Sequence, residues 1–191
     1  MLDKSIPYKH ILMKRPKGTS LKNYDLPVGF SFCKYKEGNE RQWAEIEASV
    51  AEFDDTPSAL NYYNEEFLPH VEELKRRQVF IQEATGRMAA TITAWWKITG
   101  ERRDAVIHWV AVRPEYQGRG LGKALVAEGI KQMQLYEGDV DIYLHTQTWS
   151  YKAINIYLDA GFEIFTHESF GGYKNEYDEA MEILGDRIKR A

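Results

Sequence analysis

The feature that most constrains the fold of this chain is a run of alternating glycines between an apolar stretch and a helix-like stretch. Gly118, Gly120 and Gly122 lie in the segment VAVRPEYQGRGLGKALV, which passes from a predicted buried strand into a predicted helix. Because glycine has no side chain, backbone N–H groups in such a turn can point together at one ligand. The helix start adds unpaired N–H groups and a positive dipole end. This arrangement is typical of a pyrophosphate site.

Three phosphate-binding motifs compete for this turn. A Walker loop, GxxxxGK[ST], would place Gln117 at its first glycine and Ala124 at its Ser/Thr, so the match fails at two positions. A dinucleotide motif, GxGxxG, would place Lys123 at its last glycine, so it fails as well. The pattern [QR]-x-x-G-x-[GA] is met by Gln117, Gly120 and Gly122.

The segment therefore resembles the coenzyme A pyrophosphate loop of the GNAT acetyltransferase superfamily. The apolar stretch before it, Val106–Val112, is similar to the family strand whose backbone amides bind the pantetheine arm. A second segment, SYKAINIYLDAGF, resembles the family pattern N-x-x-A-x-x-x-Y-x-x-x-G-F, with Ser150 at the position where Asn is common. Its matching residues are Ala153, Tyr157, Gly161 and Phe162.

The resemblance implies that acetyl-CoA is the cosubstrate and that no metal is used. Arg113, Arg119 and Lys123 could pair with the coenzyme phosphates, or could be ordinary solvated charges near a helix start. Asn155 is a polar candidate for the pantetheine arm, or a solvated side chain. The residues expected to bind the coenzyme are Val110, Ala111, Val112, Gln117, Gly118, Arg119, Gly120, Leu121, Gly122, Lys123, Ser150 and Asn155.

Acetyl transfer to an amine needs donors for the oxyanion, an acid for the thiolate and a route for the amine proton. The resemblance implies Tyr157 as the acid, because a phenol with a pKa near 10 can protonate a sulfur leaving group. Packing is the alternative role for Tyr157. His108 is the first candidate base, although buried histidines are often structural. His145 and Glu83 are further candidates, and amines near neutral pH also supply some neutral form without a base.

The hydrophobic pattern predicts a mixed α/β (α+β) fold: a central, mostly antiparallel sheet flanked by helices, as in GNAT proteins. We expect one domain, residues 1–191, with an N-terminal arm at 1–27 and a catalytic core at 28–191. Strands are expected around 10–13 and at 28–35, 78–84, 88–98, 105–112, 140–147 and 162–165. Helices are expected at 40–53, 58–68 with a continuation to 77, from the glycine turn to 137, and at 151–160. Residues 175–190 favour a helix, with an edge strand as the alternative.

Composition excludes several other classes of protein. The formal net charge of −4 gives no general attraction to nucleic acid or to an anionic membrane. Cys33 is the only cysteine, which excludes an internal disulfide and a multi-cysteine metal site. The start of the chain lacks the apolar run of a secretory signal, and no stretch approaches the roughly 20 apolar residues that cross a bilayer. We therefore expect a cytoplasmic enzyme without nucleic-acid or membrane partners, and the resemblance adds that homodimers are common.

The sequence says less about which residues bind the acceptor amine. Aromatic residues could line an amine pocket or form the core: these are Trp43, Tyr62, Tyr63, Trp95, Trp96 and Trp149. Acidic residues could attract a cationic amine or form a solvated helix face: these are Glu65, Glu66, Glu72 and Glu73. The resemblance implies an N-acetyltransferase that moves an acetyl group directly to a primary amine of a small molecule or peptide. A non-catalytic acyl-CoA sensor or interaction module is the alternative.

Overall fold

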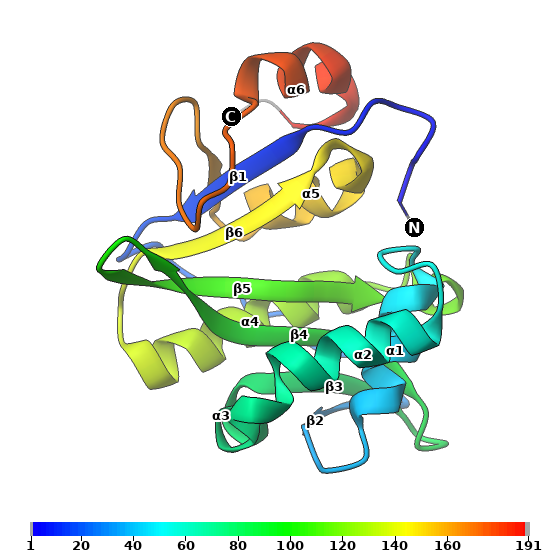
Figure 1. Ribbon diagram of the computed structural model, residues 1–191. Coiled ribbons are helices and arrows are strands. Elements are labelled where there is room, and N and C mark those ends of the chain that lie inside the picture. The colour runs from blue at the N-terminus through cyan, green and yellow to red at the C-terminus, as the bar shows by residue number, and fades with distance from the viewer. Residues whose placement is uncertain (1, 190–191) are drawn as a thin grey trace.

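One sheet organises the part of the chain that this computed structural model describes, residues 2–189 (Figure 1). Its strands follow the order β2-β3-β4-β5-β6-β1-β7, and every neighbouring pair is antiparallel except β5 and β6. The strand bounds are β1 His10–Arg15, β2 Phe30–Lys34, β3 Gln78–Glu83, β4 Met88–Thr99, β5 Arg102–Val112, β6 Ile142–Gln147 and β7 Glu163–Ile164. The predicted mixed, mostly antiparallel α/β fold is confirmed.

Helices cover both faces of the sheet, with α1, α2 and α3 in front and α4 behind in the view of Figure 1. The helix bounds are α1 Glu40–Ser49, α2 Thr56–Glu66, α3 Val71–Arg77, α4 Leu121–Glu137, α5 Tyr151–Asp159 and α6 Tyr177–Leu184. Short 3-10 turns occupy Leu68–His70, Pro114–Tyr116, Thr148–Ser150 and Gly185–Arg187. None of the helices within residues 2–189 has both the length and the apolar composition that crossing a membrane requires.

The two faces of the sheet bury different kinds of side chain. On the face of α4 and α5 the core is mainly aliphatic, with Ile92, Ile107 and Leu125 at its centre. On the face of α1–α3 it is rich in aromatic rings, and Trp43 packs against Tyr63 with ring centroids 4.9 Å apart. Burial of each large apolar side chain contributes about 1.5–3 kcal/mol, so these layers hold the helices on the sheet.

A β-bulge interrupts the pairing of β4 with β5. Thr91 lies opposite Ala111 and Thr93 lies opposite His108, so two residues of β5, Trp109 and Val110, face one residue of β4. Trp109 adopts a φ of 51°, in the left-handed region that is uncommon for residues with a side chain. A bulge leaves the extra residue outside the ladder and re-aims the side chains next to it.

The two central parallel strands separate soon after they meet. β5 pairs with β6 only at Ala105 with Ile142 and at Val106 with Tyr143. Past these pairs β6 stays hydrogen-bonded to β1 alone, while the second half of β5 stays with β4. The bulge and the separation of the strands both occur in the C-terminal half of β5.

The strand that the sequence places in an N-terminal arm lies inside the sheet. β1 pairs with β6 on one side and with β7 on the other. Its residues Ile11, Leu12 and Met13 are buried. Because hydrogen bonds on both edges and burial hold it, β1 is part of the core rather than a peripheral arm.

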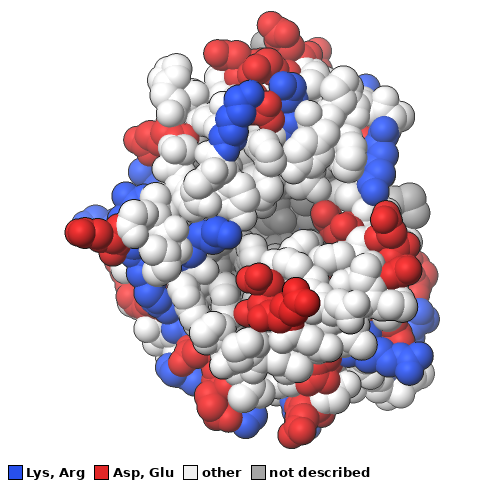
Figure 2. All heavy atoms as spheres, in the orientation of Figure 1, with Lys and Arg blue, Asp and Glu red and all other residues white. Residues whose placement is uncertain are grey.

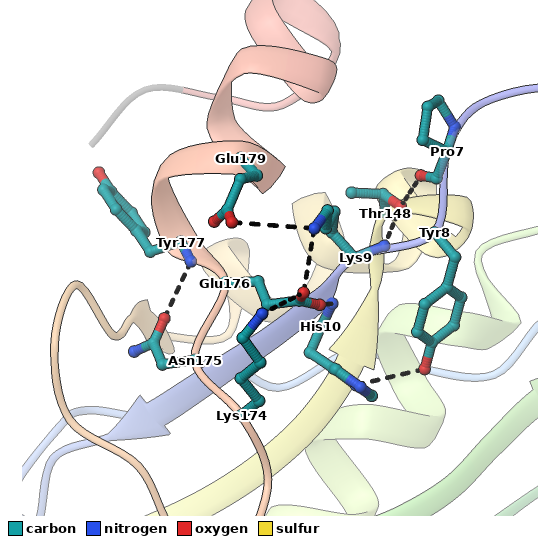
Figure 3. A network of polar contacts seen from close by, with 10 residues as sticks. All are labelled: Pro7, Tyr8, Lys9, His10, Thr148, Lys174, Asn175, Glu176, Tyr177 and Glu179. Atoms are coloured by element: carbon teal, nitrogen blue, oxygen red, sulfur yellow. Dashed lines mark hydrogen bonds and ion pairs between the residues drawn. The ribbon is translucent and has the colours of Figure 1, made fainter.

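The carboxylate of Glu176 joins this strand to the C-terminal segment (Figure 3). It accepts hydrogen bonds at 3.0 Å from the Lys9 ammonium, the His10 backbone N–H and the Lys174 ammonium. These contacts lower the pKa of Glu176 to about 2, the His10 N–H being the largest cause. The segment after residue 175 folds as the helix α6, so the edge-strand alternative does not form.

The helix boundaries around residues 49–58 differ from the sequence prediction for reasons that the backbone shows. α1 ends at Ser49, not at residue 53, because Ala51 has a φ of 67° and turns the chain away from the helix axis. α2 begins at Thr56, not at Ser58, because Asp55 is its N-cap. Ser58 completes a capping box by accepting from the Asp55 backbone while donating its own N–H to the Asp55 side chain.

Candidate functional site

A first pocket of about 590 Å³ lies beside the end of β5, the glycine turn, the start of α4 and the start of α5. Its size is in the range of ordinary ligand pockets, about 300–1,000 Å³. We call it the turn pocket. Its lining residues are Leu2, Val50, Glu52, Val110, Ala111, Val112, Tyr116, Gln117, Gly118, Gly120, Leu121, Gly122, Lys123, Val126, Ser150, Lys152, Ala153, Ile156 and Tyr157.

Backbone conformation explains two of the three glycines in the turn. Gly118 has a φ of 77° and Gly120 a φ of 84°, both in the left-handed region. A Cβ added at either position would meet no protein atom within 4 Å, so packing is not the reason for glycine there. Gly122 differs, since a Cβ there would stand 3.0 Å from the Ile156 Cδ1. It permits the close approach of α4 to α5 that forms one wall of the turn pocket.

Electrostatics at the turn pocket favour an anion. Gly120 is the N-cap of α4, so the first N–H groups of this helix and its positive dipole end lie at the pocket. Lys123 and Lys152 line the same pocket, and the Lys123 ammonium lies 3.2 Å from the Asp159 carboxylate. Among the lining residues within 2–189, Glu52 is the one carboxylate.

Most of the residues expected to bind the coenzyme line this pocket, but two do not. The Arg119 guanidinium lies 5.5 Å from the centre of the Tyr116 ring. Asn155 holds the C-terminal segment, because its side chain donates to the Arg187 carbonyl at 3.0 Å and accepts from the Lys189 N–H at 2.7 Å.

Arg113 lies outside the turn pocket, whereas Ser150 lies in its wall. Arg113 is buried, and its guanidinium donates to the Met88 carbonyl at 2.9 Å and to the Glu45 carboxylate at 3.1 Å. It therefore joins β4 to α1 instead of lining the turn pocket. Ser150 lies at the N-cap of α5 and lines the pocket, but its side chain makes no capping hydrogen bond.

A second pocket, of about 470 Å³, lies between the ends of α1 and α2, the strands β4 to β6 and the N-terminal segment. We call it the acidic pocket, after three glutamates in its wall. Figure 2 shows a hollow near the middle of this face, with acidic side chains on its rim. Its lining residues are Leu2, Lys4, Tyr8, Glu47, Ala51, Glu52, Tyr62, Glu66, Phe67, Trp95, Trp96, Lys97, His108, Trp109, Val110, His145, Thr146, Gln147, Trp149, Ser150, Ala153, Tyr157 and Tyr173.

The two pockets meet at Tyr157. This residue lines both of them and is itself buried. Burial, together with the nearby charges of Glu52 and Glu47, raises the pKa of its phenol well above the ordinary value of 10. The hydroxyl is therefore protonated at every pH near neutrality. The residues common to both pockets are Leu2, Glu52, Val110, Ser150, Ala153 and Tyr157.

The candidate bases lie in different surroundings. His108 lines the acidic pocket, and burial lowers its pKa to about 3, so the imidazole is neutral. His145 lines the same pocket, stacks on Tyr173 at 4.0 Å, and has its pKa lowered to about 4, mainly by burial. Glu83 lines neither pocket and accepts a hydrogen bond from the Tyr116 hydroxyl at 3.0 Å.

Comparison with known proteins decides the family. The model of the acetyltransferase (GNAT) family matches residues 32–162. This chain belongs to the GNAT acetyltransferase family. The predicted resemblance to the GNAT superfamily is thereby confirmed.

The GNAT relatives differ from this chain in length. Mycothiol acetyltransferase of Thermobispora bispora is 27% identical over 169 residues, which cover 81% of this chain and 53% of the relative. Mycothiol acetyltransferase of Streptomyces coelicolor is 32% identical over 82 residues, which cover 43% of this chain and 26% of the relative. This GNAT chain thus spans about half or less of the length of these curated relatives.

A solved GNAT structure has the same fold. The GCN5-related N-acetyltransferase from Sphaerobacter thermophilus superimposes with a TM-score of 0.64 at 18% identity. The match covers 84% of this chain and 49% of that protein. At this identity the likeness concerns the arrangement of the helices and strands.

The aromatic residues divide between core and pocket. Trp43 and Tyr63 are fully buried and belong to the core of this GNAT domain. The other four predicted aromatic residues line the acidic pocket: Tyr62, Trp95, Trp96 and Trp149.

The predicted acidic residues divide as well. Glu66 lines the acidic pocket. Glu72 and Glu73 pair with basic side chains of their own helix, and Glu65 is an exposed residue outside both pockets. Within residues 2–189 no group of three or more His, Cys, Asp and Glu side chains is placed to hold a metal ion.

Sequence reasoning missed two carboxylates of the site, Glu47 and Glu52. Glu47 was detectable, because it falls on the same helical stripe as Trp43, Ile46 and Val50, where an acidic residue is out of place. Glu52 gave no such signal, since its position depends on the turn that ends α1.

Proposed function

We propose that this chain transfers an acetyl group from acetyl-CoA directly to a primary amine of a small molecule or peptide. The observation that carries the proposal is the meeting of two pockets at one phenol, Tyr157. The turn pocket has the glycine turn, a helix start and two lysines beside Glu52. The acidic pocket has three glutamates and two lysines, Lys4 and Lys97. An anionic thioester carrier suits the helix start of the turn pocket, and the carboxylates of Glu52 and Glu66 suit a cationic amine in the acidic pocket.

The turn pocket suits coenzyme A on the chemistry of its own groups. The N–H groups of Leu121 and Gly122, at the start of α4, are suited to the diphosphate, and the left-handed glycines let the backbone approach it. Lys123 and Lys152 add positive charge. Past the bulge, β5 brings the backbone of Val110–Val112 to the same pocket, where N–H groups can bind the pantetheine arm and the oxyanion.

In the proposed reaction the amine nitrogen attacks the thioester carbonyl carbon, and the C–S bond then breaks. Backbone N–H groups of β5 stabilise the negative oxygen. Tyr157 gives its proton to the departing sulfur. A free-standing sensor, the alternative function, needs no second pocket beside the thioester, whereas here the acidic pocket shares six lining residues with the turn pocket. The pocket arrangement favours the transferase.

The test is release of free thiol from acetyl-CoA across a panel of primary amines. The panel contains alkylamines, polyamines, aminoglycosides, amino acids, peptide N-termini and the acceptor of mycothiol acetyltransferase, the activity named for the relatives. We expect release with at least one amine, with the acetylated amine formed in equal amount. Tight binding of acetyl-CoA without release for any amine would favour the sensor.

A further inference from the structure

The turn that ends α1 aims one carboxylate at the point where the two pockets meet. Ala51 holds a φ of 67°, and the turn is closed by hydrogen bonds from the Ala51 N–H to Ala48 and from the Glu52 N–H to Glu47. A left-handed residue with a side chain is strained, and such strain persists where the surroundings impose it, often at functional sites. The turn at Ala51 places Glu52 in the wall of both pockets.

A second carboxyl group in the acidic pocket lacks a partner. Glu47 is 1% exposed, and its Oε1 has no hydrogen-bond partner within residues 2–189. Burial raises the pKa of Glu47 well above its ordinary value, and the charge of Glu52 adds to the effect. Burial therefore favours the neutral, protonated form of Glu47. Buried polar atoms in folded proteins are nearly always paired, so an orphaned oxygen in a pocket wall indicates a ligand.

The Glu52 carboxylate is fixed by a hydrogen bond from a neutral amide. The Gln147 amide donates to its Oε1 at 3.1 Å. Burial raises the pKa of Glu52, while the Gln147 hydrogen bond and the charge of Lys4 act in the opposite direction. No basic side chain within residues 2–189 forms an ion pair with it. The other titratable side chains that line the two pockets are Lys4, Tyr8, Glu47, Tyr62, Glu66, Lys97, His108, Tyr116, Lys123, His145, Lys152, Tyr157 and Tyr173.

We propose that Glu52 is the catalytic base of this site and that the acceptor is a primary alkylamine that enters the acidic pocket as an ammonium ion. The inference rests on the proposed acetyl transfer. An alkylamine has a pKa near 10, as lysine does, so at neutral pH only a fraction of a per cent is neutral. A carboxylate binds the cation and then takes its proton. The aromatic faces of Tyr62 and Trp109 in the same pocket suit an ammonium ion and its methylene groups.

Two side chains, Glu52 and Tyr157, account for every proton that moves in the proposed reaction. The Glu52 carboxylate takes one proton from the ammonium and becomes a carboxylic acid. The neutral nitrogen bonds to the thioester carbon, the C–S bond breaks, and Tyr157 gives its proton to the sulfur. Because the raised pKa of Tyr157 makes a lasting phenolate unfavourable, it recovers a proton from the new amide nitrogen. The products are the amide and the free thiol, and the proton held by Glu52 passes to solvent.

His108 is less suited to this step. Its lowered pKa of about 3 makes the imidazole a poor proton acceptor, because a base is most effective when its pKa lies near the working pH. Its Nδ1, which has no partner within residues 2–189, can still accept a hydrogen bond from the acceptor.

Binding of a minimal probe, n-butylammonium, tests the site without requiring turnover. The probe is titrated into the protein bound to coenzyme A, which has no acetyl group to transfer, at pH 7.5 and followed by tryptophan fluorescence, for the parent, Glu52→Gln and Glu65→Gln. Glu65 is an exposed glutamate of α2 that lines neither pocket, so its variant is the matched control. We expect at least about tenfold weaker binding in Glu52→Gln alone. Equal affinity in all three proteins, or no binding by the parent, would overturn the assignment of the ammonium site.

The pH dependence of kcat/KM tests the role as base, with the best amine of the panel as acceptor. In the parent, kcat/KM is expected to be level through neutral pH, because the ammonium form binds and Glu52 removes its proton. In Glu52→Gln only the neutral amine reacts, so kcat/KM falls by about a hundredfold at pH 7.5 and rises about tenfold per pH unit toward the amine pKa. Glu65→Gln, whose side chain lines neither pocket, is the control here as well and keeps the parental profile.

The outcomes separate this inference from the proposed function. A level profile in Glu52→Gln, or the sloping profile in Glu65→Gln, would remove Glu52 as the base while leaving the acetyl transfer in place. Binding of the probe through Glu52 with no thiol release from any amine would keep the ammonium site but exclude the transfer, and with it the role of Glu52 as a base.

Discussion

At the scale of single residues, the proposed chemistry depends on Tyr157. Its side chain is buried, yet it lines both pockets, and no group within residues 2–189 hydrogen-bonds its hydroxyl. Packing alone would be satisfied by a phenylalanine. A phenol at the meeting point of two pockets, with a raised pKa, is protonated near neutral pH and so has the proton that the proposed reaction needs.

Replacement of Tyr157 by Phe should therefore lower kcat by on the order of a hundredfold, because the thiolate loses its acid. Affinity for acetyl-CoA, measured by calorimetry, should stay nearly unchanged, since the ring and its packing remain. Tyr151→Phe, on the same helix but outside both pockets, is the control and should keep parental rates. Parental turnover in Tyr157→Phe would remove Tyr157 from the mechanism.

At the scale of helices and strands, the sequence predicted what is local. The glycine turn, α4 and the strands β3 to β6 follow from apolar spacing and from turn residues that are neighbours in the chain. The end of α1 could not be predicted in this way, because no feature of the sequence indicates that Ala51 adopts a left-handed conformation. Since Glu52 follows directly, one unpredictable backbone angle concealed a central residue of the site. The bulge at Trp109 was hidden for the same reason.

The junction of β1 with the C-terminal segment gives a prediction about stability. Hydrogen bonds lower the pKa of Glu176 to about 2, so its ionised form stabilises the fold. This contribution is complete above the ordinary glutamate pKa of 4.5 and is lost as the pH falls from there toward 2. Glu176→Gln should lower the free energy of unfolding at pH 7 by about 1–2 kcal/mol, a difference that shrinks in acid.

Urea unfolding of the parent and of Glu176→Gln at pH 7, 5, 4 and 3 measures this difference. Glu179→Gln is the control, because that carboxylate is half-exposed and lies 3.8 Å from the Lys9 ammonium. Its stability should match that of the parent. If Glu176→Gln also unfolds like the parent at pH 7, the Glu176 network does not stabilise the junction.

At the scale of the whole molecule, the position of β1 is what sequence could not supply. His10 pairs with Gln147, far along the chain, and no local pattern reports such a pairing. The same pairing brings the N-terminal residues Leu2, Lys4 and Tyr8 to the wall of the acidic pocket. The turn pocket could be predicted from two contiguous motifs, whereas the acidic pocket is assembled from segments spread over the chain, so its acceptor chemistry emerges from the fold alone.

The central claim is that the glycine turn, the end of β5 and the starts of α4 and α5 form a site for acetyl-CoA. Calorimetric titration of acetyl-CoA into the parent, Gly120→Val and Gly138→Val tests it directly. Gly138 has a φ of 77° at the other end of α4, outside both pockets, so its variant carries a similar backbone strain. We predict one acetyl-CoA per chain for the parent and Gly138→Val, and at least about tenfold weaker binding for Gly120→Val. Parental affinity in Gly120→Val, or no binding by the parent, would contradict the account.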